Sequence, residues 1–384
     1  MQQFNFPTII YFGEQALQSL ATTLKQKQHK KALLVTDKTL TELGIANKVS
    51  QVIQSQGVDV VVFDDVHPNP IEQDVELGSQ AFILHHCDCL IALGGGSPMD
   101  VAKVIKVAST HPGPLAQYDD AIGGDKLIVN DMPALYAIPT TAGTGSEVGR
   151  SGVIILRESG QKTIIFAPQL MPDIAVLAPE LTIDLPAHIT AATGIDAFTH
   201  CLEAYFAPGF HPMADGIALE GMRLCLQYLA TCVEQGDNIN ARGQMQMAAT
   251  MGATAFQKGL GMTHSLAHPL SAEFNTHHGL ANALLLPFSL EFIEQHGELN
   301  SEQKEKISAI KQLFYQYNID ADRLSQCCLQ WFTQLGITFG LSQHGISEQD
   351  IAMLADKAFD DPCHHSNMVS VSRDDLYAVY AKAL

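Results

Sequence analysis

Acidic and imidazole side chains in the second half of the chain are spaced as the ligands of a metal ion. Asp196 and His200 are four residues apart, His264 and His268 repeat that spacing, and His277 and His278 follow in tandem. Residues four apart in a helix lie on one face. A carboxylate and several imidazoles from separate helices suit a divalent first-row metal with an open position for substrate. The spacing predicts a metal site but leaves open which of the four later histidines are ligands.

Two loops of small residues in the first half have the composition of a phosphate-binding site. Residues 93–100 read Leu-Gly-Gly-Gly-Ser-Pro-Met-Asp, follow an expected strand and open an expected helix, where Ser97 could be the cap. Glycines let a phosphate approach the backbone, and a helix N-terminus offers free N–H groups. The second loop, residues 139–147, clusters hydroxyls with glycines. Either loop alone could be an ordinary turn, but two of them at strand ends favour a nucleotide site.

Asp37 ends the first expected strand in this half. A carboxylate in that place can accept a hydrogen bond from a ribose 2′-hydroxyl, and it would repel the 2′-phosphate of NADP. In the usual fingerprint this acid follows the glycines by about 20 residues. Here Asp37 precedes Gly94 by 57 positions. The residues alone therefore leave open whether Asp37 contacts a ribose or caps a turn.

The elements that must position these residues differ between the two halves. Short β-branched runs alternate with helix-like stretches at 40–56, 71–85 and 98–109, and the runs are 32–36, 58–63, 89–93, 135–138, 153–156, 163–166 and 174–177. Strands end near Leu185, and from His188 the pattern is helical. The chain is thus predicted to have an α/β dinucleotide-binding domain with a mainly parallel sheet at residues 1–184. An all-α metal and substrate domain would follow at 185–384, with the site in a cleft between them.

Composition limits the possible partners. The 384 residues include 41 acidic and 22 basic side chains, a net charge of −19, which disfavours nucleic acid and anionic lipid. No signal peptide is recognisable, no apolar run approaches the roughly 18 residues of a membrane span, and eight cysteines are too sparse for a disulfide scaffold. Between residues 188 and 300 only Arg223, Arg242 and Lys258 are basic. We therefore expect a cytoplasmic protein, often a homo-oligomer at this size, with a small neutral substrate.

With these residues assembled, the chain resembles the iron-dependent (group III) alcohol dehydrogenases over essentially its whole length. The resemblance rests on four ordered motifs, at residues 94–103, 140–147, 194–200 and 264–279. Three departures leave the expected ligands intact: Ala178 where the family commonly has Asp, Ser271 where it has Gly, and Met368-Val369 where it has Pro-Arg.

The resemblance implies roles for individual residues. The metal ligands would be Asp196, His200, His264 and His278. His268 would lie beside the nicotinamide and the substrate, where it would either support the ligands or relay a proton, and His277 would be a bystander. Asp37 becomes a ribose contact that favours NAD. Around the dinucleotide the resemblance also places Asn69, Gly95, Gly96, Ser97, Asp100, Thr140, Thr141 and Lys162.

The implied activity is reversible hydride transfer between NAD(H) and a small alcohol and its aldehyde or ketone. One carboxylate and three imidazoles suit Fe(II) or Zn(II), and the resemblance favours Fe(II). Two alternatives stay open. An NAD- and metal-dependent lyase of the dehydroquinate-synthase type is disfavoured by the few basic residues of the helical half. A non-enzymatic protein would bind metal or nucleotide without turnover.

Overall fold

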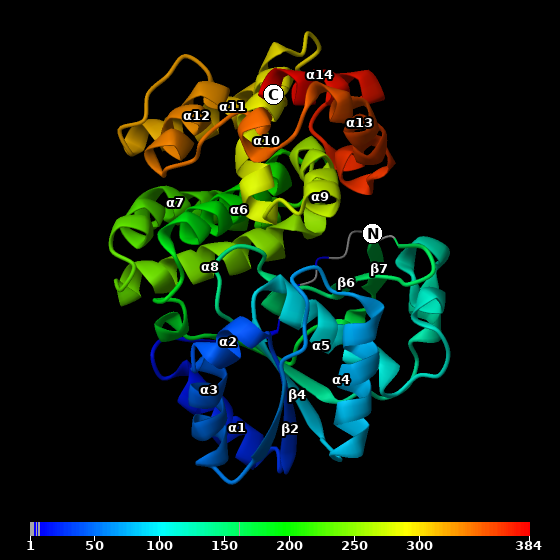
Figure 1. The fold of residues 1–384 in the computed structure, drawn as a ribbon. Coiled ribbons are helices and arrows are strands. Elements are labelled where there is room, and N and C mark those ends of the chain that lie inside the picture. The colour runs from blue at the N-terminus through cyan, green and yellow to red at the C-terminus, as the bar shows by residue number, and fades with distance from the viewer. Residues whose placement is uncertain (1–3, 5, 7, 161) are drawn as a thin grey trace. The chain divides into compact units, whose positions relative to one another are not determined.

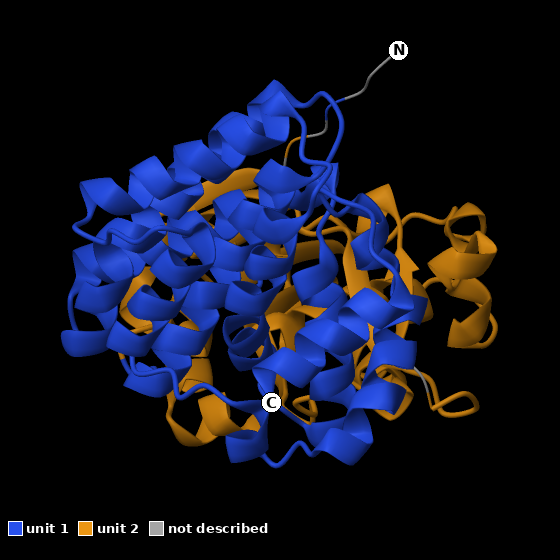
Figure 2. Ribbon diagram, turned by 90° about the horizontal axis from the view of Figure 1, so that it is seen from above, with its two compact units in different colours: residues 1–5, 142–144, 184–384 blue, residues 6–141, 145–183 orange. Residues whose placement is uncertain are grey.

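The computed structural model describes residues 4, 6, 8–160 and 162–384, which form two compact units (Figure 2). The sheet unit comprises residues 6–141 and 145–183. The helical unit comprises residues 184–384 together with 142–144 and the start of the chain. Among the described residues, no helix combines the length and the apolar composition that a membrane crossing requires.

The sheet unit is built on six parallel strands in the order β1-β8-β5-β4-β2-β3. Their side chains are mostly aliphatic, and the central strands are buried on both faces, as a parallel sheet requires. The bounds are β1 Ile9–Phe12, β2 Lys31–Val35, β3 Asp59–Phe63, β4 Cys89–Gly94, β5 Ala134–Pro139 and β8 Ile174–Leu177.

Successive residues of one strand belong to different hydrophobic cores. Ala32 and Leu34 of β2 pack in the cluster that includes α1 (Ala16–Gln26) and α3 (Ile45–Gln54). Leu33 and Val35 pack instead with α4 (Glu72–Leu84) and α5 (Gly96–Ala108). Figure 1 shows these two pairs of helices on opposite sides of β2 and β4. The predicted α/β architecture, with helices on both faces of a parallel sheet, is confirmed.

Three details differ from the prediction. Strand β1 was not expected, and β6 (Ser151–Ile155) pairs with β7 (Lys162–Phe166) in a separate antiparallel sheet. The helix expected at 40–56 is divided into α2 (Lys38–Glu42) and α3. The break lies at Gly44, whose φ of 76° is left-handed and incompatible with a continuous helix.

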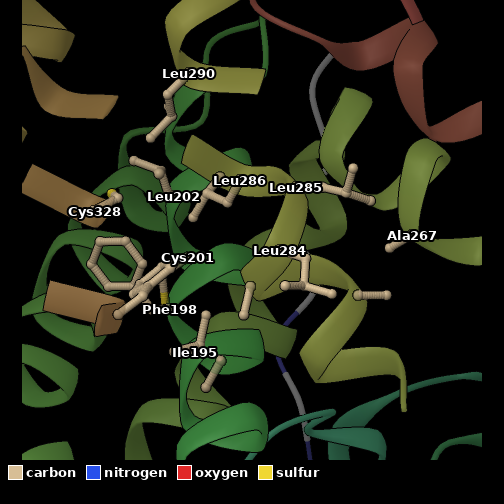
Figure 3. Packing of buried hydrophobic residues seen from close by; sticks show 14 of the residues in the cluster. Ile195, Phe198, Cys201, Leu202, Ala267, Leu284, Leu285, Leu286, Leu290 and Cys328 are labelled. Atoms are coloured by element: carbon tan, nitrogen blue, oxygen red, sulfur yellow. The ribbon is translucent and has the colours of Figure 1, made fainter. Parts of the chain in front are cut away.

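The helical unit contains nine α-helices in its described residues: α6 Ala187–Phe206, α7 Pro212–Glu234, α8 Ile239–Ala255, α9 Met262–Phe274, α10 His278–Gln295, α11 Ser301–Gln316, α12 Leu324–Gln334, α13 Ile351–Asp360 and α14 Arg373–Ala383. Helix α6 is buried at every position from Thr190 to Phe206. Figure 3 shows its side chains Phe198 and Leu202 beside those of α10. The predicted helical second half is confirmed, and α6 lies at its centre.

Candidate active site

Helix α6 presents two of the predicted metal ligands from inside the core. Asp196 and His200 are one helical turn apart, and both are buried. A helix that is surrounded by other helices normally carries apolar residues on all sides. Polar side chains at two adjacent positions of one face therefore need a partner within the unit, and the neighbouring helices provide one.

Helices α9 and α10 bring two imidazoles to this face of α6. His264 Nε2 lies 3.9 Å and His278 Nε2 lies 3.5 Å from Asp196 Oδ1, and the His200 and His264 rings stack at 4.6 Å. Donor atoms of Asp196, His200, His264 and His278 all lie within 4.8 Å of one another. His277 is the N-cap residue of α10 and is not part of this group. The spacing alone left four histidines open, and the structure brings together the set that the family resemblance implied.

The protonation states leave lone pairs in the centre of this group. Burial by itself would raise the pKa of Asp196, but the three neighbouring imidazoles and the amide of Asn282 lower it to about 2. Burial lowers the pKa of His200 to about 4 and that of His278 well below its usual range. At neutral pH the group is thus an ionised carboxylate facing two uncharged imidazoles, a donor set suited to a divalent cation.

Unsatisfied polar atoms support the same conclusion. Asn282 is buried, and its Nδ2 lies 2.7 Å from Asp196 Oδ1, 3.3 Å from His264 Nε2 and 3.2 Å from His278 Nε2. Among the described residues, Asn282 Oδ1 and His200 Nδ1 find no hydrogen-bond partner. A buried polar atom without a partner is costly. The residues present fit a bound cation, and sequence reasoning missed Asn282 although it lies one turn after His278.

His268 lies beside the cluster and contacts a carboxylate that sequence reasoning missed. Its Nδ1 is 2.7 Å from Asp361 Oδ2, and its ring stacks on that of His278 at 5.3 Å. Asp361 Oδ1 accepts hydrogen bonds from Ser265 Oγ and from the Cys363 backbone N–H, each at 2.9 Å. Burial would raise the pKa of Asp361, but the hydrogen bond and charge of His268 hold it well below its usual range. Asp361 is therefore an ionised acceptor that fixes one nitrogen of His268.

Close packing of α10 on α6 depends on Gly279. A Cβ at this position would meet the Ala192 carbonyl oxygen and carbon of α6 well inside contact distance. We expect Gly279→Ala to lower the free energy of unfolding by about 1–3 kcal/mol and to weaken metal binding, because α10 must move away from α6. Gly216 of α7 has nothing within 4 Å of such a Cβ, so Gly216→Ala should stabilise the chain by roughly 0.5–1 kcal/mol. Urea unfolding of both variants tests this, and equal stabilities would contradict it.

In the sheet unit, residues of both predicted nucleotide loops meet at the carboxyl ends of neighbouring strands. Asp37 follows β2, Gly95 and Gly96 follow β4, and Thr140 and Thr141 follow β5, and these three strands are parallel neighbours. The Thr140 backbone N–H donates to the Gly94 carbonyl, and a Cβ at Gly95 would lie 3.5 Å from Thr141 Oγ1. Strand order reverses between β2 and β4, which is where open α/β sheets bind ligands.

Asp37 and Ser97 each make a contact that the sequence left undecided. Asp37 caps α2 by accepting from the Leu40 N–H at 3.0 Å through Oδ1, which leaves Oδ2 for a further donor. The expectation that Ser97 caps α5 is wrong. Gly95 is the N-cap residue, and Ser97 Oγ instead donates to the Pro68 carbonyl at 2.6 Å, next to the half-buried Asn69.

The Asp100 carboxylate is engaged within the sheet unit. Its oxygens accept from Ser146 Oγ at 3.1 Å and from the Val153 N–H at 3.3 Å. The buried Lys103 ammonium lies 4.0 Å away and donates to Ser146 Oγ at 2.7 Å. Burial raises the pKa of Asp100, and the charges of Lys103 and of Lys162, at the start of β7, act against this rise. Asp100 and Lys103 therefore fix the loop that begins at Thr140.

Comparison with known proteins agrees with this architecture. The family model described as iron-containing alcohol dehydrogenase matches residues 7–179, and that of the Fe-containing alcohol dehydrogenase family, C-terminal, matches 190–384. The 4-hydroxybutyrate dehydrogenase of Cupriavidus necator is 36% identical over 90% of both chains, and the NAD-dependent methanol dehydrogenase of Bacillus methanolicus is 33% identical over 100% of both. A crystal structure of 1,3-propanediol oxidoreductase superposes with a TM-score of 0.91 at 32% identity, covering 100% of both chains.

These matches confirm the resemblance that the four sequence motifs indicated. Two family models together account for nearly all of the chain, and full-length relatives exceed 30% identity. The fold, the donor cluster and the comparisons thus lead to one conclusion: the chain belongs to the iron-containing alcohol dehydrogenase family.

Proposed function

We propose that this oxidoreductase transfers hydride reversibly between NAD(H) and a small alcohol and its carbonyl product, with a divalent metal as cofactor. The observation that carries the proposal is the cluster of Asp196, His200, His264 and His278, four donors within 4.8 Å of one another. A cation held by these four residues would supply Lewis acidity to the substrate oxygen. Fe(II) is the first choice because of the family, and Zn(II) accepts the same donors.

In this proposal His268 accepts and returns the proton of the alcohol, and Asp361 orients His268. Because Asp361 engages Nδ1 of His268, Nε2 is the nitrogen left to take up the hydroxyl proton during oxidation and to return it during reduction. The ionised Asp361 stabilises the imidazolium that forms, and Ser265 and the Cys363 N–H keep its carboxylate in place. The nicotinamide would supply the hydride chemistry, and the chain would orient the reactants and exclude water.

For the dinucleotide, we assign the carboxyl-end edge of the parallel sheet, within a domain of residues 1–184. Asp37 would use its second oxygen for the ribose 2′-hydroxyl, while its first caps α2. Asn69, Gly95, Gly96, Ser97, Thr140, Thr141 and Lys162 would contact the cofactor, and Asp100 would act by holding Ser146. Residues 185–384 would form the metal and substrate domain of a cytoplasmic homo-oligomer.

The relatives narrow the substrates worth testing. Those reported above are named for methanol, 4-hydroxybutyrate and 1,3-propanediol, all of which carry a primary hydroxyl. Of these three, only 4-hydroxybutyrate is an anion at neutral pH. With three basic residues between positions 188 and 300, we expect this chain to prefer the neutral alcohols.

Metal removal and restoration test the proposal. Protein purified without oxygen is stripped with a chelator, restored with Fe(II) or Zn(II), and assayed for NADH with primary alcohols, diols and 4-hydroxybutyrate. We expect activity only after restoration, and a preference for NAD+ over NADP+ of at least about tenfold, because Asp37 repels a 2′-phosphate. Protein that binds both metal and NAD+ but oxidises none of these alcohols would contradict the proposal.

A further inference from the structure

We infer that Glu203 is the positioning residue of the metal centre, holding His264 in the orientation in which it binds the metal. The inference rests on the proposed metal site and adds a residue to it. Glu203 Oε2 lies 2.5 Å from His264 Nδ1, and Oε1 accepts the Thr263 backbone N–H at 2.7 Å. Both side chains are buried, so neither bond is shared with solvent.

The contact decides which nitrogen of His264 faces the cluster. An ionised carboxylate can only accept a hydrogen bond, so His264 Nδ1 must carry a proton. In the uncharged ring the lone pair is then on Nε2, the atom that lies 3.9 Å from Asp196 Oδ1 and 3.3 Å from Asn282 Nδ2. Carboxylates in this position fix the tautomer and the ring plane of metal-binding histidines and increase their basicity.

Helix α6 delivers all three side chains from one face. Asp196, His200 and Glu203 stand at positions i, i+4 and i+7, so they follow one another along the same stripe. The first two reach the cation site directly, whereas Glu203 reaches it through α9. One buried helix thereby determines two ligands and the orientation of a third.

The start of α9 is shaped to receive this carboxylate. A Cβ at Gly261 would lie 2.8 Å from Glu203 Oε1 and 2.8 Å from Asn367 Oδ1, so the backbone passes close to both side chains. Asn367 Oδ1 accepts the Met262 N–H at 3.2 Å, next to the bond from Thr263. A neutral glutamine could accept the Thr263 N–H equally well. The helix N-terminus also favours a carboxylate, but His264 is the larger of the two influences that keep Glu203 ionised.

The experiment compares two isosteric substitutions. Glu203→Gln removes the charge beside His264 while keeping an acceptor for Thr263. Glu294→Gln is the matched control, because Glu294 of α10 also caps a helix: its oxygens accept from the N–H groups of Leu324 and Ser325 at 2.6 and 3.1 Å, outside the donor cluster. Chelator competition should show a dissociation constant for Zn(II) raised about 10- to 100-fold in Glu203→Gln and changed less than about twofold in Glu294→Gln. The visible spectrum of the Co(II) form should change only in Glu203→Gln.

A double-mutant cycle separates action through His264 from a merely structural role. On a His264→Ala background, Glu203→Gln should weaken metal binding by less than about twofold, because the residue through which Glu203 acts is gone. A tenfold loss that persists on that background overturns the inference. If Glu203→Gln does not fold, as judged by circular dichroism, Glu203→Asp enters the same cycle, since it withdraws the carboxylate from Nδ1, and the same two outcomes decide.

Failure of this inference can be told apart from failure of the proposed function. If Glu203→Gln binds Zn(II) like the unaltered protein while His200→Ala does not, the metal centre stands and Glu203 has no part in it. If His200→Ala also binds Zn(II) normally, the metal centre itself is assigned wrongly.

Discussion

Replacing His200 with alanine should strongly weaken metal binding and reduce alcohol oxidation by at least about a thousandfold. The substitution removes one of four donors and one of the neighbours that lower the pKa of the buried Asp196. Lewis-acid stabilisation is worth several kcal/mol, and about 4 kcal/mol corresponds to a thousandfold in rate. Metal content by emission spectroscopy and the rate of NADH formation measure the two losses. Binding of NAD+, followed by calorimetry, should persist, because the residues predicted to contact the dinucleotide belong to the sheet unit.

A second buried histidine of the same unit provides the control. His211 accepts the Ala214 N–H through Nδ1 as the N-cap of α7 and has no place in the donor cluster. Asparagine is a good N-cap, so His211→Asn should keep both the fold and the metal. Normal metal content and rate in His200→Ala would remove His200 from the ligand set.

Loss of the proton relay should reduce turnover while the metal stays bound. We expect His268→Ala to lower kcat for alcohol oxidation by about 10²- to 10⁴-fold, the usual contribution of general acid–base catalysis. Asp361→Asn should cause a smaller loss, about tenfold, because the His268 ring keeps its nitrogen but loses the charge that stabilises its protonated form. Both variants should contain the same amount of metal as the unaltered protein, since neither residue belongs to the four-donor cluster.

The pH dependence of the oxidation rate tests whether His268 acts as a proton relay. Oxidation releases a proton, and without His268 that proton must pass to hydroxide, so the deficit of His268→Ala should shrink as pH rises from 6 to 10. In the unaltered protein the pKa of Asp361 is held well below its usual range by His268, so this carboxylate stays ionised throughout and contributes no inflection to the reference profile. Asp356→Asn, at an exposed residue of α13 that pairs with Arg373, should behave like the unaltered protein. A deficit that does not vary with pH would count against the relay.

Periodicity in the sequence was sufficient to predict the architecture, because the strands and helices of this chain bury their apolar faces in regular patterns. The seven expected strand runs all correspond to strands, and the second half is helical. Strand β1 was missed because its four residues are only partly buried at the edge of the sheet, where the pattern is weakest. The separate pairing of β6 with β7 could not be read either, since register across a turn depends on tertiary packing.

The metal ligands could be predicted from local spacing in the sequence, whereas the residues that orient them could not. Asp196 and His200 are four residues apart, as are His264 and His268. Two polar side chains on one face of a buried helix need a common partner, so this spacing indicates a ligand. Asp361 is 93 positions from His268, so no local pattern joins them. Glu203 does share the face of Asp196, but an acidic residue on a helix is normally solvated, and only its burial shows that it is not.

The uneven exposure of the four donors has a consequence for how fast the metal is exchanged. The side chains of Asp196 and His264 are 2% and 1% exposed, whereas that of His278 is 30% exposed. His278 is also the first residue of α10, and helix ends open more readily than helix centres. A chelator should therefore remove the ion at a rate set by the fraying of this one turn. The lifetime of the metal-bound protein is then determined by backbone motion at residues 277–279. The affinity for the metal depends instead on all the donors, so the two properties can change independently.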